Sequence, residues 1–173
     1  IKPLGFKDYS ALSNGIDATN IGSNVNIANW PIKGVYMPDA MTRFNVGGIE
    51  YLITANEGDA REYTGYSEIG RMSSSTYPLD PTAFPNGDVI KANIGRLNIT
   101  MANGDTDNDG DYDEIYTYGA RSITIWNTTT GMKVWDSGDD FEMITSQHPQ
   151  LAALFNASNA NNTFKNRSDD KGP

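Results

Sequence analysis

Three short apolar segments separated by clusters of turn-forming residues constrain this chain to a β fold. Ile115–Tyr118, Ser122–Trp126 and Met132–Trp135 are rich in β-branched and aromatic residues, which favour strands over helices. Gly119 and residues 127–131 lie between them and supply the turns. With 17 Gly and 8 Pro among 173 residues, the composition also favours strands joined by many turns over a helical bundle.

The stretch "SITIWNTTTGMKVWDSG" has the pattern of the inner hairpin of a β-propeller blade. Its apolar residues alternate, it turns at a Thr-Gly pair, and it ends close to a Trp-Asp pair. A second hairpin is predicted upstream, where Gly47 and Gly48 form a turn between Arg43–Val46 and Ile49–Ala55. We therefore expect residues 1–173 to form part of a β-propeller domain, mainly β, with long loops and one or two short helices.

One short helix and one long loop complete the expected secondary structure. Residues 146–155 predict the helix, because Ser146 can cap its start and Pro149 falls near its first turn. An apolar stripe follows at Leu151, Leu154 and Phe155. Residues 60–88 are rich in Ser, Pro and Gly, and a loop of that length is usually functional or flexible. The tryptophans are expected in the core: Trp30, Trp126 and Trp135.

The charge and the missing residue types exclude several classes of protein. The sequence has 22 acidic and 13 basic residues, and its net charge of −9 disfavours nucleic acid and suits cations. It has no Cys, and its one histidine, His148, is expected to cap a helix or to lie at the surface, so a zinc site rich in His or Cys is excluded. The sequence contains no nucleophile elbow, no phosphate loop and no apolar run long enough to span a bilayer. Any catalysis would therefore use carboxylates, arginines and hard metal ions.

Residues 104–116, "GDTDNDGDYDEIY", place aspartates at alternate positions around a glycine. Like charges this close cost free energy unless a cation neutralises them. The run fits a calcium-binding loop, in which Gly110 provides the sharp turn at the sixth position. The aspartates then occupy the alternating ligand positions of the loop: Asp105, Asp107, Asp109, Asp111 and Asp113.

The loop does not predict an EF-hand. The last ligand position holds Tyr116 where an EF-hand has a bidentate Glu, and a strand follows where an EF-hand has a helix. We therefore expect calcium in a β-hairpin loop, bound by four aspartate side chains and by the backbone carbonyl of Asp111. So closed a ligand set predicts a calcium ion that is chiefly structural. The alternative interpretation is a solvated turn rich in aspartate.

A second polar cluster follows the predicted upstream hairpin. The stretch "TANEGDAREY" places Glu57, Asp59 and Arg61 after a strand, where loops often build sites. Two acids beside an arginine can bind a metal ion and a phosphate together, with the guanidinium group as a fork for the anion. Arg121, in "GARS", is a second residue that could hold a phosphate. These four residues are the candidate catalytic groups, and the alternative is a polar turn with a surface ion pair.

Longer motifs resemble those of a family of secreted bacterial proteins. They are "LGFKDYSALSNGIDATN", "NWPIKGVYMPDAM", "YLITANEGDAREY", "GDTDNDGDYDEIYTYGARSITIW" and "VWDSGDDFE", in this order. The sequence is similar to the choice-of-anchor I family, often described as alkaline-phosphatase-like, and to the mesenchyme-specific cell-surface glycoproteins of biomineralising animals. The resemblance implies a β-propeller, a secreted, periplasmic or cell-surface location, and a chain that normally continues past residue 173.

Two functions follow as hypotheses. The first is a calcium-dependent phosphoester hydrolase, in which a metal-bound water attacks while Arg61 or Arg121 holds the phosphate. The second is a non-enzymatic surface or adhesion module that calcium stabilises. In both cases we expect the remainder of the same protein, or another copy, to complete the propeller, because unclosed sheets leave strand edges exposed.

Overall fold

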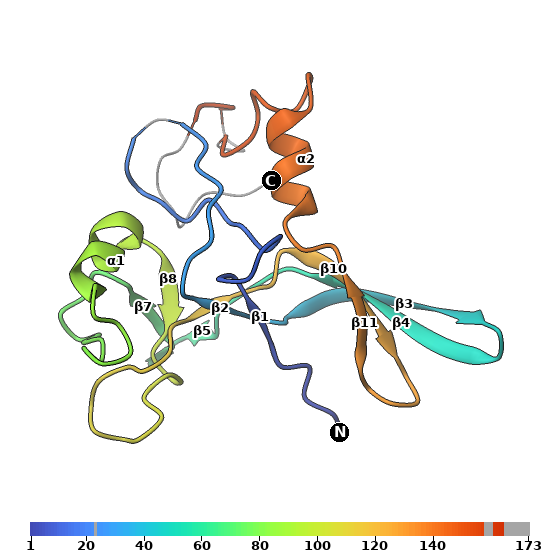
Figure 1. Ribbon diagram of the computed structural model, residues 1–173, viewed down its shortest axis with the longest axis horizontal. Helices are drawn as coiled ribbons and strands as arrows, with labels where there is room; N and C mark the ends of the chain where they lie inside the picture. Colours follow the sequence, from blue (N-terminus) through green and yellow to red (C-terminus); the bar gives the residue numbers. More distant parts are fainter. Residues whose placement is uncertain (23, 158–160, 165–173) are drawn as a thin grey trace.

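The computed structural model describes residues 1–22, 24–157 and 161–164. In this part of the chain, two open sheets lie side by side, with a short helix next to each (Figure 1). The four-stranded sheet has the order β11-β10-β4-β3 and consists of β3 (Pro38–Val46), β4 (Ile49–Asn56), β10 (Ser122–Asn127) and β11 (Lys133–Asp136). The five-stranded sheet has the order β1-β2-β9-β8-β7 and consists of β1 (Phe6–Asp8), β2 (Lys33–Val35), β7 (Ile69–Arg71), β8 (Asn98–Thr100) and β9 (Tyr116–Tyr118). The remaining elements are the hairpin of β5 (Glu62–Tyr63) with β6 (Tyr66–Ser67), and the helices α1 (Gly87–Ile94) and α2 (Asp140–Gln147).

The four-stranded sheet confirms the predicted upstream hairpin (β3–β4) and the strands predicted at β10 and β11, whereas the strand predicted at Ile115–Tyr118 is β9 of the five-stranded sheet. β3 and β4 pair around Gly47 and Gly48, whose positive φ angles of 59° and 83° suit a tight turn of glycines. All neighbouring strands are antiparallel and follow the order of the chain, but residues 57–121 lie between β4 and β10. The edges of the sheet are therefore local hairpins, whereas its central pairing is long-range.

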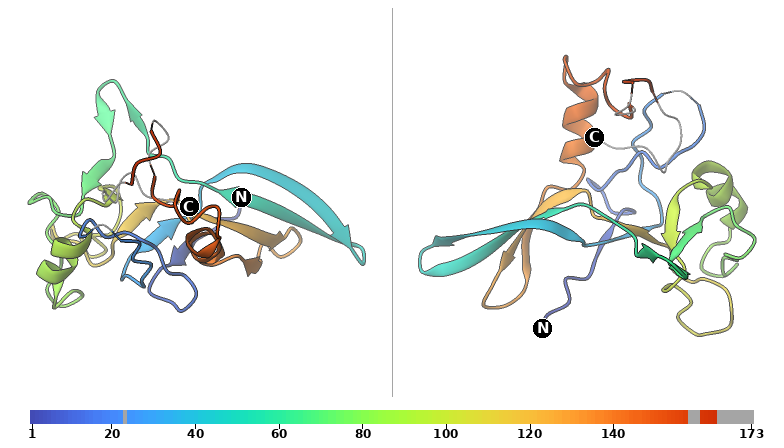
Figure 2. Two further views of the ribbon diagram at one scale, coloured as in Figure 1. Left: turned by 90° about the horizontal axis from the view of Figure 1, so that it is seen from above. Right: turned by 180° about the vertical axis from the view of Figure 1, so that it is seen from behind.

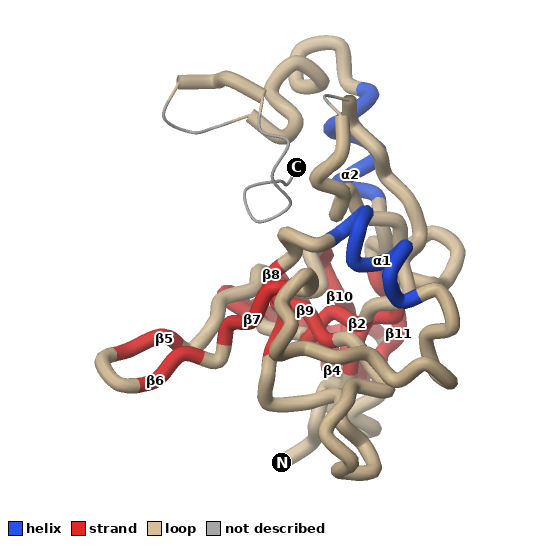
Figure 3. The backbone as a smooth tube through the Cα atoms, turned by 90° about the vertical axis from the view of Figure 1, so that its left-hand side faces the viewer, coloured by secondary structure: helices blue, strands red, loops and turns tan. Residues whose placement is uncertain are grey.

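The main core lies between the five-stranded sheet and α1. This sheet is mixed, because β2 pairs in parallel with β9 while its other neighbours are antiparallel. Ile94 of α1, Ile99 of β8 and Ile115 before β9 are buried in one cluster with Tyr9 and Tyr77. Figure 3 shows α1 next to the strands of this sheet. Burial of large side chains from distant segments is what holds α1 in place, since an eight-residue helix is marginal by itself.

The predicted fold class is confirmed at the level of a mainly β chain with two short helices. The two large sheets do not close into a ring within the described residues, so this arrangement does not establish a propeller.

The helix predicted at residues 146–155 is misplaced. α2 ends at Gln147, because Pro149 disfavours helical backbone in the residue before it, and His148 is extended (φ −72°, ψ 129°). His148 therefore follows the helix where a role at its start was expected, and its Nδ1 accepts a hydrogen bond from the Gln150 N–H (3.2 Å). Phe155 is buried, but residues 149–156 form turns in place of a helix.

Residues 60–88 are not one long loop. The β5–β6 hairpin, β7 and the start of α1 fall within them. Of the expected core tryptophans, Trp126 is buried and Trp30 packs against the main core, but Trp135 is 47% exposed. The prediction for Trp135 is wrong because this residue lies on the uncovered face of the four-stranded sheet.

A chain of hydrogen bonds crosses the buried face of the four-stranded sheet. The indole of Trp126 donates to the Thr54 hydroxyl (3.0 Å), which donates to Oδ1 of the Asn56 side chain (2.9 Å). The side-chain amide of Asn56 donates to the Thr124 hydroxyl (2.6 Å), which donates to the Asp136 carboxylate (2.5 Å). These bonds join β4, β10 and β11 on one face, so they fix the register of the long-range pairing.

Asn56→Ala should lower the free energy of unfolding by about 2–3 kcal/mol, because it leaves buried hydroxyl groups without their partner. Urea unfolding followed by circular dichroism measures this loss. Thr42→Ala, on exposed β3, is the control and should change stability by less than about 0.5 kcal/mol. Equal losses in the two variants would contradict the role of the network.

Candidate functional site

The five aspartates of the predicted calcium loop divide between two groups. Carboxylate oxygens of Asp105, Asp107 and Asp109 lie within 4.8 Å of one another. Asp111 and Asp113 form a second group with the same spacing, and its third member is Asp80, outside the motif. The acidic loop, defined here as residues 104–113 together with Asp80, therefore offers two neighbouring sets of three carboxylates.

Asp80 reaches the loop through backbone pairing that no local pattern predicts. The Asp80 N–H donates to the Tyr112 carbonyl (3.1 Å), and the Tyr112 N–H donates to the Pro78 carbonyl (3.0 Å). The rings of Tyr77 and Tyr112 stack with their centroids 3.8 Å apart. This contact brings together segments that are distant in sequence, so sequence reasoning missed Asp80, and only a pairing signal between the segments could have revealed it.

The backbone of the acidic loop turns where the calcium pattern expects it to. Gly110 has φ 102° and Asn108 has φ 63°, both in the left-handed region. The Gly110 N–H donates to Asp105 Oδ2 (3.2 Å), which closes the first half of the loop. The amide and hydroxyl of Thr106 donate to Asp113 Oδ2 (2.8 and 2.7 Å), which joins the two halves.

The carboxylates of the loop have different electrostatic surroundings. Loss of hydration and then the neighbouring carboxylates, Asp109 foremost, raise the pKa values of Asp107 and Asp111. The hydrogen bonds from Thr106 lower the pKa of Asp113. One oxygen in each group, Oδ1 of Asp105 and Oδ1 of Asp111, is buried and accepts no hydrogen bond. Buried oxygens of this kind cost free energy unless a partner, such as a cation, satisfies them.

A second candidate site lies at the seam where the chain passes between the two large sheets. Three segments of the chain cross this seam: the segment between β2 and β3, the segment that follows β4, and the segment between β9 and β10. We call each of them a crossing. A side chain at Gly119 (φ 81°) would collide with the Glu57 carbonyl, and one at Gly58 would come within 2.6 Å of the Gly119 backbone. The crossing after β4 and the crossing between β9 and β10 can therefore touch only because Gly58 and Gly119 have no side chain.

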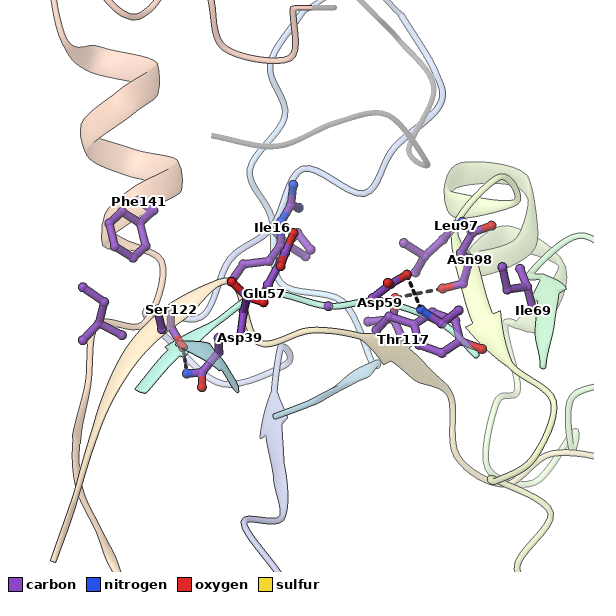
Figure 4. Close-up of a pocket in the computed structure, with 17 residues that line it drawn as sticks. Ile16, Asp39, Glu57, Asp59, Ile69, Leu97, Asn98, Thr117, Ser122 and Phe141 are labelled. Atoms are coloured by element: carbon purple, nitrogen blue, oxygen red, sulfur yellow. Dashed lines mark hydrogen bonds between the residues drawn. The ribbon is translucent and has the colours of Figure 1, made fainter. Parts of the chain in front are cut away.

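A pocket of about 740 Å³ opens at this seam. Each crossing contributes charge to it: Asp39 comes from β3, Glu57 and Asp59 follow β4, and Arg121 precedes β10. Figure 4 shows Asp39 and Glu57 in one half of the pocket, near Ser122, and Asp59 in the other half, near Asn98 and Thr117. Neutral polar side chains also line it, and so do five large apolar ones: Ile16, Ile69, Leu97, Ile123 and Phe141.

Three of the four candidate catalytic residues line the pocket, but Arg61 does not. The Arg61 side chain donates from Nε (2.9 Å) and Nη2 (2.7 Å) to Glu68 Oε2, and its backbone N–H donates to Glu68 Oε1 (2.8 Å). These bonds lower the pKa of Glu68 and raise that of Arg61. The guanidinium group also lies over the ring of Tyr66. Arg61 therefore orders the start of the β5–β6 hairpin.

Arg121 is held in the pocket by buried groups on other elements. Its backbone has φ 48°, which is uncommon for a residue with a side chain. Its Nη1 lies 3.1 Å from Oε1 of Glu142, a buried residue of α2 whose pKa is raised by desolvation. The Tyr9 hydroxyl donates to the Gly119 carbonyl (3.1 Å), and Lys7 Nζ donates to the Ala120 carbonyl (2.8 Å). Sequence analysis missed Glu142, Lys7 and Tyr9, because they reach this site only in the folded chain.

The two sites differ in chemistry. No residue of the acidic loop lines the pocket. Among the described residues, the pocket carboxylates do not form a group of three spaced to share a metal ion, whereas the loop carboxylates form two such groups. The loop therefore suits a hard cation, and the pocket suits an organic ligand that contacts both charged and apolar side chains.

Gly119→Ala should lower the free energy of unfolding by more than about 3 kcal/mol, because its methyl group would collide with the Glu57 backbone and its φ is positive. Gly47→Ala is the matched control: Gly47 also has a positive φ, but its Cβ would meet nothing within 4 Å. It should cost only about 1–2 kcal/mol of backbone strain. Thermal or urea unfolding compares the two variants, and similar losses would mean that the seam is not tightly packed.

The comparisons with known proteins agree with the resemblance found in the sequence. The chain is 33% identical to Gigasin-3a of Magallana gigas over 83 residues, which are 46% of this chain and 29% of that protein. The match thus spans under a third of the relative. No solved structure matches the chain. Among the described residues, no helix has the length and apolar character needed to cross a membrane. The model of the choice-of-anchor I domain matches residues 1–173. Because this match covers the whole sequence, the chain belongs to the choice-of-anchor I family, which points to a secreted or cell-surface protein.

Proposed function

We propose that this chain is an extracellular surface module whose fold is stabilised by calcium at the acidic loop. The observation that carries the proposal is the pair of buried oxygens, Oδ1 of Asp105 and Oδ1 of Asp111, that accept no hydrogen bond. Each belongs to a different group of three carboxylates. Calcium prefers several hard oxygen ligands in flexible geometry, and it would satisfy both atoms and offset the repulsion within each group.

The placement of Asp80 supports a structural role for the ion. A cation shared by Asp80, Asp111 and Asp113 would tie the segment before α1 to the loop before β9. A second cation would rest on Asp105, Asp107 and Asp109. We therefore propose two adjacent calcium positions in place of the single position that the loop pattern predicts.

The four-stranded sheet supports a blade-like unit within such a module. Its strands are antiparallel neighbours in chain order, as in the meander of a propeller blade, and the acidic loop lies in the long insertion between β4 and β10. We therefore propose that this sheet is one blade of a β-propeller.

Calorimetry tests the calcium sites directly. We expect two calcium ions per chain, with Asp80→Asn removing one and Asp105→Asn removing the other. Asp88→Asn, an exposed aspartate in α1, is the matched control and should bind like the parent protein. At a calcium concentration a hundred times the dissociation constant, each ion adds about 2.7 kcal/mol to stability, so a chelator should lower the melting temperature.

Two results would count against the calcium proposal. One is the absence of calcium-dependent heat in the parent protein. The other is an Asp88→Asn variant that loses as much binding as Asp105→Asn, because the signal would then reflect diffuse negative charge instead of the loop.

A phosphoester hydrolase is the second candidate, favoured by Arg121, which lines one pocket with Glu57 and Asp59. If the chain hydrolyses a generic phosphomonoester, Arg121→Ala should reduce kcat/KM by about a hundredfold, since a charge-assisted contact to the phosphate is lost. Arg61→Ala is the control and should leave turnover nearly unchanged, because Arg61 is bound to Glu68 outside the pocket. Absence of turnover with and without chelator would leave the non-enzymatic module as the function.

A further inference from the structure

The four-stranded sheet buries several polar residues beside Trp126 and leaves a row of apolar residues exposed on its other face. In β10, Ser122, Thr124 and Trp126 are buried, while the alternating Ile123 and Ile125 remain partly exposed. In β4, Thr54 and Asn56 are buried in the same way. A sheet with one covered face normally does the reverse, with apolar residues toward the core and polar residues toward water.

Strand register places apolar residues from all four strands together on the exposed face, opposite Leu52 and Trp126. Ile125 of β10 lies opposite Ile53 of β4 and Trp135 of β11. Tyr51 of β4 lies opposite Phe44 of β3, and their rings stack with centroids 5.2 Å apart. We call this surface the outer face and define it by six residues: Phe44, Val46, Tyr51, Ile53, Ile125 and Trp135.

No element in the described part of the chain covers this surface. Val46 and Trp135 are 59% and 47% exposed, and the other four residues are half-buried by their neighbours in the sheet. Figures 1 and 2 show the β3–β4 hairpin extending away from the rest of the molecule in every view. A continuous apolar patch of this kind marks an interaction surface, because its exposure to water costs free energy.

The size of the outer face suits a contact between two copies. The four strands have 9, 8, 6 and 4 residues, and each residue covers about 16 Å² at the usual rise and strand spacing, so the face measures about 440 Å². Two such faces together bury about 900 Å², which lies in the range of weak, transient contacts below about 1,200 Å². Sheets pack face to face at about 10 Å, and a two-fold contact requires only that one patch be complementary to itself.

Charge favours the same contact. The chain carries a net charge of −9, so two copies repel each other over most of their surface. The six residues of the outer face carry no charge, and they offer a surface on which two acidic chains can meet without burying like charges.

We propose that the outer face is the interface between two copies of this chain, packed sheet against sheet. The prediction is a reversible dimer at the weak end of the range for specific complexes.

Sedimentation of the whole polypeptide that contains these residues, over a range of concentrations, tests this. Val46→Glu should weaken dimerisation tenfold or more, because it places a charge in an apolar contact. Val89→Glu is the matched control: Val89 lies on α1, outside the outer face, and its exposed fraction of 60% nearly equals that of Val46. Circular dichroism checks that each variant is folded. If Val46→Glu does not fold, Phe44→Glu serves as the second variant.

The remaining outcomes overturn the proposal. A parent chain that stays monomeric at all concentrations has no such interface. A dimer that survives both Val46→Glu and Phe44→Glu uses another surface, and assemblies larger than a dimer exclude a closed two-fold contact. A monomer in which hydroxyl radicals fail to label Tyr51 and Trp135 would mean that another part of the same polypeptide covers the outer face.

Discussion

One buried ammonium group connects the N-terminal strand to the seam and to α2. Lys7 Nζ donates to the carbonyls of Ala120 (2.8 Å) and Gly138 (2.5 Å), and it lies 3.7 Å from Asp136 Oδ1. Desolvation lowers the pKa of Lys7, while Asp136 and Glu142 act in the opposite direction. A buried charge is tolerated only when all of its partners are in place. The geometry of the seam, the position of Arg121 and the start of α2 therefore depend on one side chain of β1.

Local patterns predicted the two hairpins of the four-stranded sheet and the strand at β9, but not β1, β2, β7 and β8, which pair with distant segments. The Gly47-Gly48 turn and the alternation in β10 needed no knowledge of distant residues. The position of α2 failed because Pro149 was interpreted as a residue of the first turn, whereas it ends the preceding helix. The missed site residues share a different cause. Asp80 and Glu142 reach their sites through tertiary packing, and Arg61 leaves the pocket because Glu68 binds it.

The two candidate sites divide the chemistry of the chain between different parts of the fold. The carboxylates of the acidic loop converge at ligand spacing on a segment that packs beside the main core. The charged groups of the pocket come from three separate crossings, and each is placed by the strand next to it. An ion at the loop would therefore affect stability, whereas a ligand in the pocket would contact the point at which the two sheets join.

The insertion between β4 and β10 has a consequence for how the chain folds. Asn56 and Ser122 are 66 residues apart in sequence, yet they pair directly at the centre of the four-stranded sheet. Closing a loop of this length costs entropy before the central contacts form, and dependence on distant contacts slows folding. The β3–β4 and β10–β11 hairpins can form early, since each is local. We therefore expect the two hairpins to form first and to pair with each other only after the inserted segment has collapsed.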